Sequence, residues 1–205
     1  MHPDTKAVAE HMREFGLAIL GRAVYDLTFS ELMAPYKHSM SVGLAAQGAE
    51  ICIKARIAQE HPLLLFTQLP KSANADDQLT MKELFEYGRT VPYADLPETL
   101  WATTGIRIAR VEQYQKFGKL RNLLVHFGPA DVVPIEDVPM KFLFEVMEPL
   151  VQAFWKESII PYAAAWDGVL LDGHLEDMLQ QSDVEITPAL RAALDAAGSS
   201  TGDPS

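Results

Sequence analysis

The chain has 205 residues, of which 48% are hydrophobic and 22% are charged, and its formal net charge is −11. This length fits one domain with an appendage, and the composition excludes collagen-like, mucin-like and wholly disordered chains. The charge is placed unevenly, because residues 131–205 carry 14 acids against Lys141, Lys156 and Arg191, whereas the first 130 residues are neutral overall. The acidic average therefore does not by itself exclude a nucleic-acid ligand.

Apolar residues at helical spacing predict two long helices in the first part of the chain. The first spans residues 5–33 and is expected to end at Pro35, and the second spans residues 41–60 and is expected to end before Pro62. Residues 69–100 contain three prolines and predict a loop that includes one short helix, over residues 80–89. Within that helix, Thr80 and Glu83 have the spacing of a capping box.

Two further helices are predicted to complete the core. One spans residues 105–127, and Gly128 followed by Pro129 is the expected stop signal. The other spans residues 139–155 and is expected to continue with a kink at Pro149 as far as residue 161. The sequence therefore predicts an all-α fold, an antiparallel helical bundle of about four to five core helices over residues 1–165.

Residues 166–205 form a predicted acidic C-terminal extension. Thr187 and Pro188 begin a short helix rich in alanine and leucine, and the segment from Gly198 onward is expected to be disordered. We expect one of two roles for the 14 acids of residues 131–205. They either solvate the extension or fold back over a basic strip and mimic RNA phosphates.

Several classes of site are not expected. The single cysteine, Cys52, lies between two isoleucines and is predicted to be a core residue. The six histidines show no metal-ligand spacing and no nucleotide-binding motif is present, so we expect neither a metal nor a cofactor. No signal peptide or membrane-spanning run is recognisable, so we expect a cytoplasmic chain without a membrane partner.

The segment with the strongest functional signal lies within the predicted helix over residues 105–127. Between residues 107 and 121 it carries one acid, Glu112, and five basic residues: Arg107, Arg110, Lys116, Lys119 and Arg121. On a helical wheel the three arginines fall on one edge, and Asn122 and His126 fall on the other side. Gly118 and Val125 lie between the edges and predict a shallow seam that another helix can approach.

Arg121, Asn122 and His126 resemble the motif of the HEPN superfamily, all-helical domains marked by an arginine and a histidine with four to six residues between them. The upstream pair Glu50 and Lys54, in an apolar setting, is similar to a second feature of that family. The resemblance spans residues 5–165 and does not include the acidic extension. Arg56 and His61 have a comparable spacing, but Ile57 follows the arginine and His61 precedes Pro62, so we interpret that pair as incidental.

The resemblance implies a metal-independent ribonuclease whose cleft is shared by two protomers, as in toxin–antitoxin, defence or RNA-processing systems. The implied catalytic residues are Arg121, His126 and, in support, Asn122. The implied substrate-binding residues are Arg107, Arg110 and Lys119, with Glu50 reaching the cleft to orient Arg121. The expected partners are RNA, a second copy of the chain, and an antitoxin or other regulatory protein.

A second interpretation stays open, in which the chain is a catalytically inactive HEPN-like module that dimerises and binds a nucleotide, RNA or a protein. Each candidate residue also has a purely structural interpretation. Arg121 is then a surface charge, and His126 caps the free carbonyls at a helix end. Glu50 and Lys54 are then an ion pair on one helix.

Overall fold

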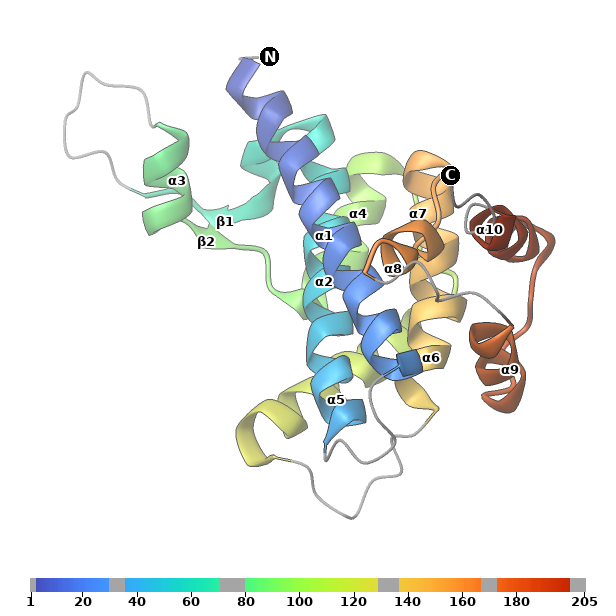
Figure 1. Ribbon diagram of the computed structural model, residues 1–205. Coiled ribbons are helices and arrows are strands. Elements are labelled where there is room, and N and C mark those ends of the chain that lie inside the picture. Colours follow the sequence, from blue (N-terminus) through green and yellow to red (C-terminus); the bar gives the residue numbers. More distant parts are fainter. Residues whose placement is uncertain (1–2, 30–35, 71–79, 129–136, 167–172, 200–205) are drawn as a thin grey trace.

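The computed structural model describes residues 3–29, 36–70, 80–128, 137–166 and 173–199 (Figure 1). Nearly all the regular structure in these ranges is helical, which confirms the predicted all-α class. In chain order the elements are α1 (Pro3–Phe29), α2 (Lys37–Glu60), η1 (Pro62–Leu65), β1 (Phe66–Gln68), α3 (Met81–Tyr87), β2 (Arg89–Thr90), η2 (Tyr93–Asp95), α4 (Leu96–Thr104), α5 (Val111–Phe127), α6 (Val138–Lys141), η3 (Phe142–Met147), α7 (Glu148–Trp155), α8 (Ile160–Ala164), α9 (His174–Gln181) and α10 (Pro188–Ser199).

Helices α1 and α2 lie side by side and antiparallel through the body of the molecule (Figure 1). Glycines let their backbones approach closely: a Cβ placed on Gly16 would lie 2.7 Å from Cys52 Sγ, and one placed on Gly48 would lie 2.9 Å from Leu20 Cγ. Cys52 is fully buried in this contact, as predicted for a core residue. Helix α2 ends before Pro62 as predicted, whereas the expected end of the first helix at Pro35 lies outside the described residues.

The small arm that precedes α4 differs in part from the prediction. The capping box is confirmed, because Thr80 accepts the backbone N–H of Glu83 and the Glu83 carboxylate accepts the backbone N–H of Thr80. Sequence reasoning missed the antiparallel strands β1 and β2, since segments of three and two residues are too short to show an alternating pattern. This arm projects from the helical body (Figure 1).

The prediction of one continuous helix over residues 105–127 is wrong. Helix α4 occupies residues 96–104 and ends at Gly105, whose φ of 75° is left-handed, and α5 begins only at Val111. Pro97 starts α4 rather than breaking it, because a proline in the first helical turn loses no intrahelical hydrogen bond. The five residues from Ile106 to Arg110 therefore form a non-helical connection.

The last core helix runs without interruption from Val138 to Trp155 and includes a π-helical segment, η3. Pro149 is the second residue after η3, and a proline has no backbone N–H to donate to the preceding turn. The wider turn accommodates this defect, because Glu148 N–H donates to Leu143, five residues back. The helix ends at Lys156, in a left-handed conformation, so the predicted continuation to residue 161 is wrong and α8 is a separate element.

The acidic C-terminal helices pack onto the body. Buried leucines of α9 and α10 belong to the same apolar core as α1 and α2: Leu175, Leu179, Leu190 and Leu194. The two helices contact α1 and α8 and lie on a different side of the molecule from α5 (Figure 1). The described part of the extension therefore does not cover α5, contrary to the RNA-mimic hypothesis, and residues 200–205 of the expected disordered segment lie outside the described residues. Among the described helices, none is both long and apolar enough to cross a membrane.

Candidate functional site

The candidate motif occupies the C-terminal half of α5. Arg121 is half-buried, and its Nη1 donates to Asn122 Oδ1 over 3.0 Å. Asn122 and His126 are exposed, and the imidazole meets the Phe127 ring edge-on. Helix α5 ends at Gly128, whose φ of 73° is left-handed, so the predicted stop signal is confirmed and His126 lies in the last turn.

Arg121 and His126 lie on different sides of α5. Asn122 and His126 are four residues apart, and Lys119 precedes Asn122 by three, so these three side chains share one exposed face. Arg121 precedes His126 by five residues, which turns its side chain by roughly 140° from the imidazole on a regular helix. A single protomer therefore presents the guanidinium and the imidazole toward different surroundings.

Arg121 faces a shallow groove between α5 and the start of α2, with a volume of about 360 Å³. Its lining is mostly apolar: Tyr36, Ser39, Met40, Gly43, Leu124 and Val125, besides Arg121 itself. Sequence reasoning missed the contribution of Tyr36 and Met40, for which the only local signal is the proline that precedes Tyr36. Tyr36 has a left-handed φ of 67°, an unfavourable conformation for a residue that carries a Cβ.

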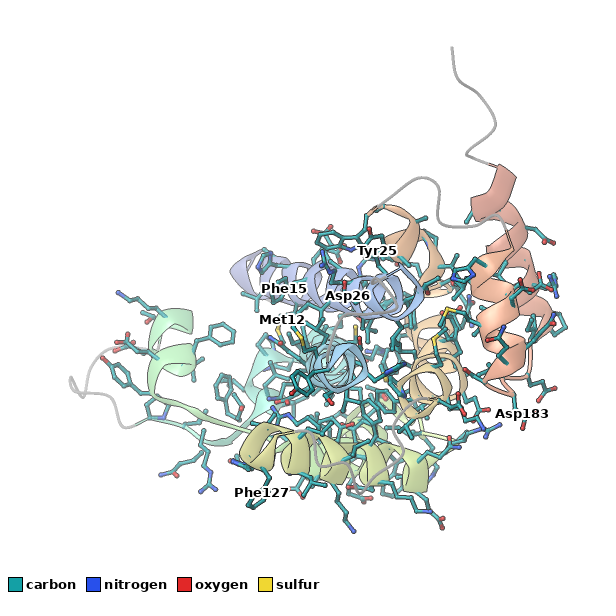
Figure 2. All side chains as sticks on the ribbon, turned by 60° about the horizontal axis from the view of Figure 1, so that its bottom comes forward. Met12, Phe15, Tyr25, Asp26, Phe127 and Asp183 are labelled. Atoms are coloured by element: carbon teal, nitrogen blue, oxygen red, sulfur yellow. The ribbon has the colours of Figure 1, made fainter. Side chains whose placement is uncertain are left out.

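Three large apolar side chains that line this groove, and Phe127 beyond them at the end of α5, are strongly exposed, and we call these four the apolar patch. Their exposed fractions are 64% for Tyr36, 67% for Met40, 62% for Val125 and 79% for Phe127. Figure 2 shows Phe127 at the end of α5, directed away from the body. Exposed apolar side chains gathered as Tyr36, Met40 and Val125 are at this groove mark interaction sites more often than isolated apolar residues do.

The predicted seam along α5 is only partly open. A Cβ placed on Gly118 would lie 2.5 Å from Tyr93 Cε1, so the Tyr93 ring of the same chain covers this glycine. Burial raises the pKa of the Tyr93 phenol, and the nearby charge of Glu50 raises it further, whereas the charge of Arg121 lowers it. The close approach expected at Gly118 is thus made by the short helix η2 of the same chain, while Val125 stays accessible.

The predicted basic strip is not assembled as expected. Arg107 lies in the connection before α5, and its guanidinium is 4.1 Å from the ring centroid of Trp101. Arg110 is the N-cap residue of α5, and its Nη1 lies 2.8 Å from a carboxylate oxygen of Glu145. Because residues 105–110 are not helical, the helical-wheel edge shared with Arg121 does not exist.

Glu50 does not bond to Arg121 in the described structure. Its Oε1 accepts from Lys54 Nζ over 2.7 Å, one turn along α2, and Lys54 Nζ also donates to Thr90 Oγ1 over 3.2 Å. Lys54 is buried, and its hydrogen bond to Thr90, not the ion pair within α2, joins α2 to strand β2. The ion-pair interpretation of Glu50 is thus confirmed, in a more buried setting than expected.

The second arginine–histidine pair has local structural partners. Arg56 Nη1 lies 2.8 Å from Glu60 Oε1 on the same helix. His61 Nδ1 accepts the backbone N–H of Leu63 over 3.2 Å and so caps η1. The pair offers a matched control for the motif at Arg121 and His126.

The residues that the structure describes contain no group of three or more histidine, cysteine or acidic side chains placed to hold a metal ion. Comparison of the chain with family models, curated proteins and solved structures gives no match. The functional argument therefore depends on the residues and their geometry.

Proposed function

We propose that this chain is a metal-independent endoribonuclease of HEPN type that acts as a homodimer. The observation that carries the proposal is the placement of Arg121, Asn122 and His126 at the accessible end of α5, beside the apolar patch. Among the described residues, no carboxylate forms an ion pair with Arg121. Its guanidinium is thus available for a phosphate, which arginine binds through two parallel hydrogen bonds.

Cleavage of RNA by its own 2′-OH requires two proton transfers. It also requires stabilisation of the negative charge that develops on the phosphoryl oxygens. An imidazole accepts the proton of the ribose 2′-OH, and the 2′-oxygen attacks phosphorus. The P–O5′ bond breaks as a second imidazole, protonated beforehand, donates its proton to the leaving oxygen. Arg121 stabilises the charge that develops on the phosphoryl oxygens, and the products are a 2′,3′-cyclic phosphate and a 5′-OH.

A second protomer supplies what one chain lacks. One His126 cannot serve both steps at once, and Arg121 faces away from the imidazole of its own helix. Pairing of two α5 ends across a twofold axis would cover Val125 and Phe127 and bring two copies of the motif into one cleft. The burial of four exposed apolar side chains in each protomer favours this association.

Incubation of the protein with mixed RNA in excess EDTA tests the activity. We expect cleavage with cyclic-phosphate ends, lost by at least about a hundredfold in both His126→Ala and Arg121→Ala. The matched controls are His61→Ala and Arg56→Ala, which have a comparable spacing and should cleave as the wild type does. Intact RNA at high protein concentration, or equal loss in the control pair, contradicts the proposal.

Light scattering tests the dimer. Val125→Asp and Phe127→Asp should yield folded monomers without nuclease activity, because each places a charge in the proposed interface. Phe85→Asp changes another exposed phenylalanine, on α3, and should leave the dimer intact. A wild-type protein that stays monomeric at high concentration contradicts the composite cleft.

The inactive module is the second candidate, and one observation favours it. Arg107 and Arg110 are engaged by Trp101 and Glu145, so α5 lacks the broad basic surface typical of nucleic-acid binders. RNA, nucleotide or protein binding that needs Arg121, without cleavage, would identify this module. In either case, a toxin–antitoxin or defence setting and an antitoxin-like partner follow from the resemblance alone.

A further inference from the structure

A second cavity lies on the other side of α5, between this helix and the α6–η3 segment. It has a volume of about 330 Å³, within the size range of small-molecule sites. Its walls are mostly apolar and come from Phe117 and Leu120 of α5 and from Val138 and Phe142. The Phe117 and Phe142 rings stack in parallel with centroids 3.7 Å apart, which gives the cavity a rigid aromatic wall.

Two ammonium groups accompany this apolar surface. Lys116 of α5 and Lys141 of α6 both line the cavity. Within the described part of the chain, neither lysine has a carboxylate partner, in contrast to Arg110 nearby, which is paired with Glu145. Two cations without a carboxylate partner among the described residues, beside an apolar cavity, favour a ligand that carries a negative charge.

Gln113 adds a directional hydrogen-bond acceptor. Its Nε2 donates to Glu145 Oε2 over 3.2 Å, which fixes the orientation of the amide, since a flipped amide would place two oxygens together. Its Oε1 has no hydrogen-bond partner among the described residues and is itself buried, so a ligand reaches it only when the Gln113 side chain shifts toward the cavity that it lines. Because a buried acceptor without a partner is unfavourable, a ligand that donates an N–H or O–H group there after this shift gains affinity.

The backbone beside the cavity is irregular. Phe142 is the first residue of the π-helical segment η3, and Lys141 and Val138 belong to the short helix directly before it. Such wide turns are frequent at functional sites, because they displace side chains from the positions that a regular helix would give them. The stacked phenylalanines make the aromatic wall of the cavity preformed.

We propose that this cavity binds a small organic anion with an aromatic or alicyclic body, one carboxylate or comparable acid group, and one N–H or O–H donor. The apolar body lies against Phe117 and Phe142, the anionic group pairs with Lys116 and Lys141, and the donor bonds to Gln113 Oε1. This site uses a face of α5 other than the one that carries Arg121, and the inference does not depend on the proposed nuclease.

Calorimetric titration of the full chain with three matched probes tests the proposed chemistry. Indole-3-acetate carries the aromatic body, the carboxylate and the N–H donor. Indole-3-acetamide lacks the charge, and naphthalene-2-acetate lacks the donor. We expect saturable binding of indole-3-acetate with one site per chain, and roughly five- to tenfold weaker binding of each analogue.

Variants locate the site. Lys141→Met and Val138→Phe should weaken the binding of indole-3-acetate by about tenfold or more, the first by removal of a cation and the second by filling the cavity. Lys119→Met removes an exposed lysine of α5 outside the cavity and is the matched control, expected within twofold of wild type. Circular dichroism establishes that each variant is folded.

Three results overturn the inference. They are the absence of saturable binding, equal affinity for the acid and the amide, and unchanged affinity in folded Lys141→Met. Because Lys141→Met preserves most of the side-chain volume and Lys141 is only half-buried, this variant tests the site even where Val138→Phe does not fold. Nuclease activity is measured in the same samples, so failure of the cavity and failure of the nuclease are distinguished.

Discussion

Tyr93 and Tyr114 bond to each other reciprocally. Tyr93 Oη donates to the carbonyl oxygen of Tyr114 over 3.4 Å, and Tyr114 Oη donates to that of Tyr93 over 3.2 Å. Their rings stack with centroids 4.3 Å apart and nearly parallel planes. Burial raises the pKa of both phenols, so both remain neutral donors at physiological pH. The pair attaches η2 to α5 and holds the Tyr93 ring on Gly118.

Gly118→Ala should therefore destabilise the protein. The added methyl group would lie 2.5 Å from a ring carbon of Tyr93, and the stack with Tyr114 prevents that ring from moving aside. We expect a loss of about 1–3 kcal/mol in the free energy of unfolding, measured by urea denaturation. Gly43→Ala on α2 is the matched control, because a Cβ there meets nothing within 4 Å. It should stabilise by about 0.5–1 kcal/mol, and equal effects at both glycines would contradict the packing argument.

Replacing Glu50 and replacing Lys54 should lower the free energy of unfolding by different amounts. Glu50→Gln leaves the buried Lys54 ammonium without a counter-charge, and we expect a loss of about 1–2 kcal/mol in the free energy of unfolding. Lys54→Met removes the buried charge together with its desolvation cost. It should therefore lower the free energy of unfolding by less than Glu50→Gln does. Chemical denaturation of both single variants and of the double variant measures the coupling. A coupling energy near zero would mean that the ion pair between Glu50 and Lys54 does not stabilise the fold.

Glu148→Gln should change how stability depends on pH. Burial raises the pKa of the Glu148 carboxyl above its ordinary value, although the backbone N–H of Ile159 donates to it over 2.8 Å. As pH rises past the ordinary glutamate pKa, the unfolded chain releases the proton first, and the wild type loses stability until pH passes the raised folded pKa. The stability of Glu148→Gln relative to wild type should therefore increase across that window.

Thermal unfolding at a series of pH values checks this expectation. Glu148→Ala leaves the Ile159 N–H without an acceptor and should be destabilised by about 1–3 kcal/mol throughout the series. Glu112→Gln, an exposed carboxylate on α5, is the control and should follow the wild-type curve. A pH-independent difference between Glu148→Gln and wild type would refute the assignment.

Cys52 should be unreactive in the folded protein. Its thiol is fully buried between α1 and α2, and burial raises its pKa, which disfavours the nucleophilic thiolate. We expect 5,5′-dithiobis(2-nitrobenzoate) to label the native protein slowly and the guanidinium-unfolded protein at once. Fast labelling of the native protein would mean that α1 and α2 separate readily.

The helices of the body could largely be predicted from the sequence, because their apolar periodicity and stop signals are local. Thr80 and Glu83 form their capping box through contacts three residues apart. Gly128 ends α5 through its own backbone conformation. The start of α5 was not predictable in this way. The predicted helix begins at Gly105, but residues 106–110 form a non-helical connection after the left-handed Gly105, and α5 begins only at Val111.

The residues of the candidate motif could be predicted from the sequence, but the side chains that surround them could not. The spacing of Arg121 and His126, which Arg56 and His61 share, indicates the motif only together with Asn122 directly after the arginine. Arg107 and Arg110 were misplaced, because their partners Trp101 and Glu145 come from α4 and η3, which the chain brings near only on folding. Tyr36 and Tyr93 lie close to α5 only in the folded chain, and the sequence marks their positions by no more than the prolines that precede them, Pro35 and Pro92.

The close pairing of α1 and α2 has a consequence for the order of folding. Consecutive helices meet with little loss of chain entropy, so the first 60 residues can pair early, while the rest of the chain is still being synthesised. The end of α5, with Arg121 and His126, can then dock only onto a hairpin that is already present. Helices α9 and α10 dock onto α1 and α8 after the rest of the body is complete. We therefore expect a ribosome-bound chain to protect Cys52 well before its C-terminal helices emerge.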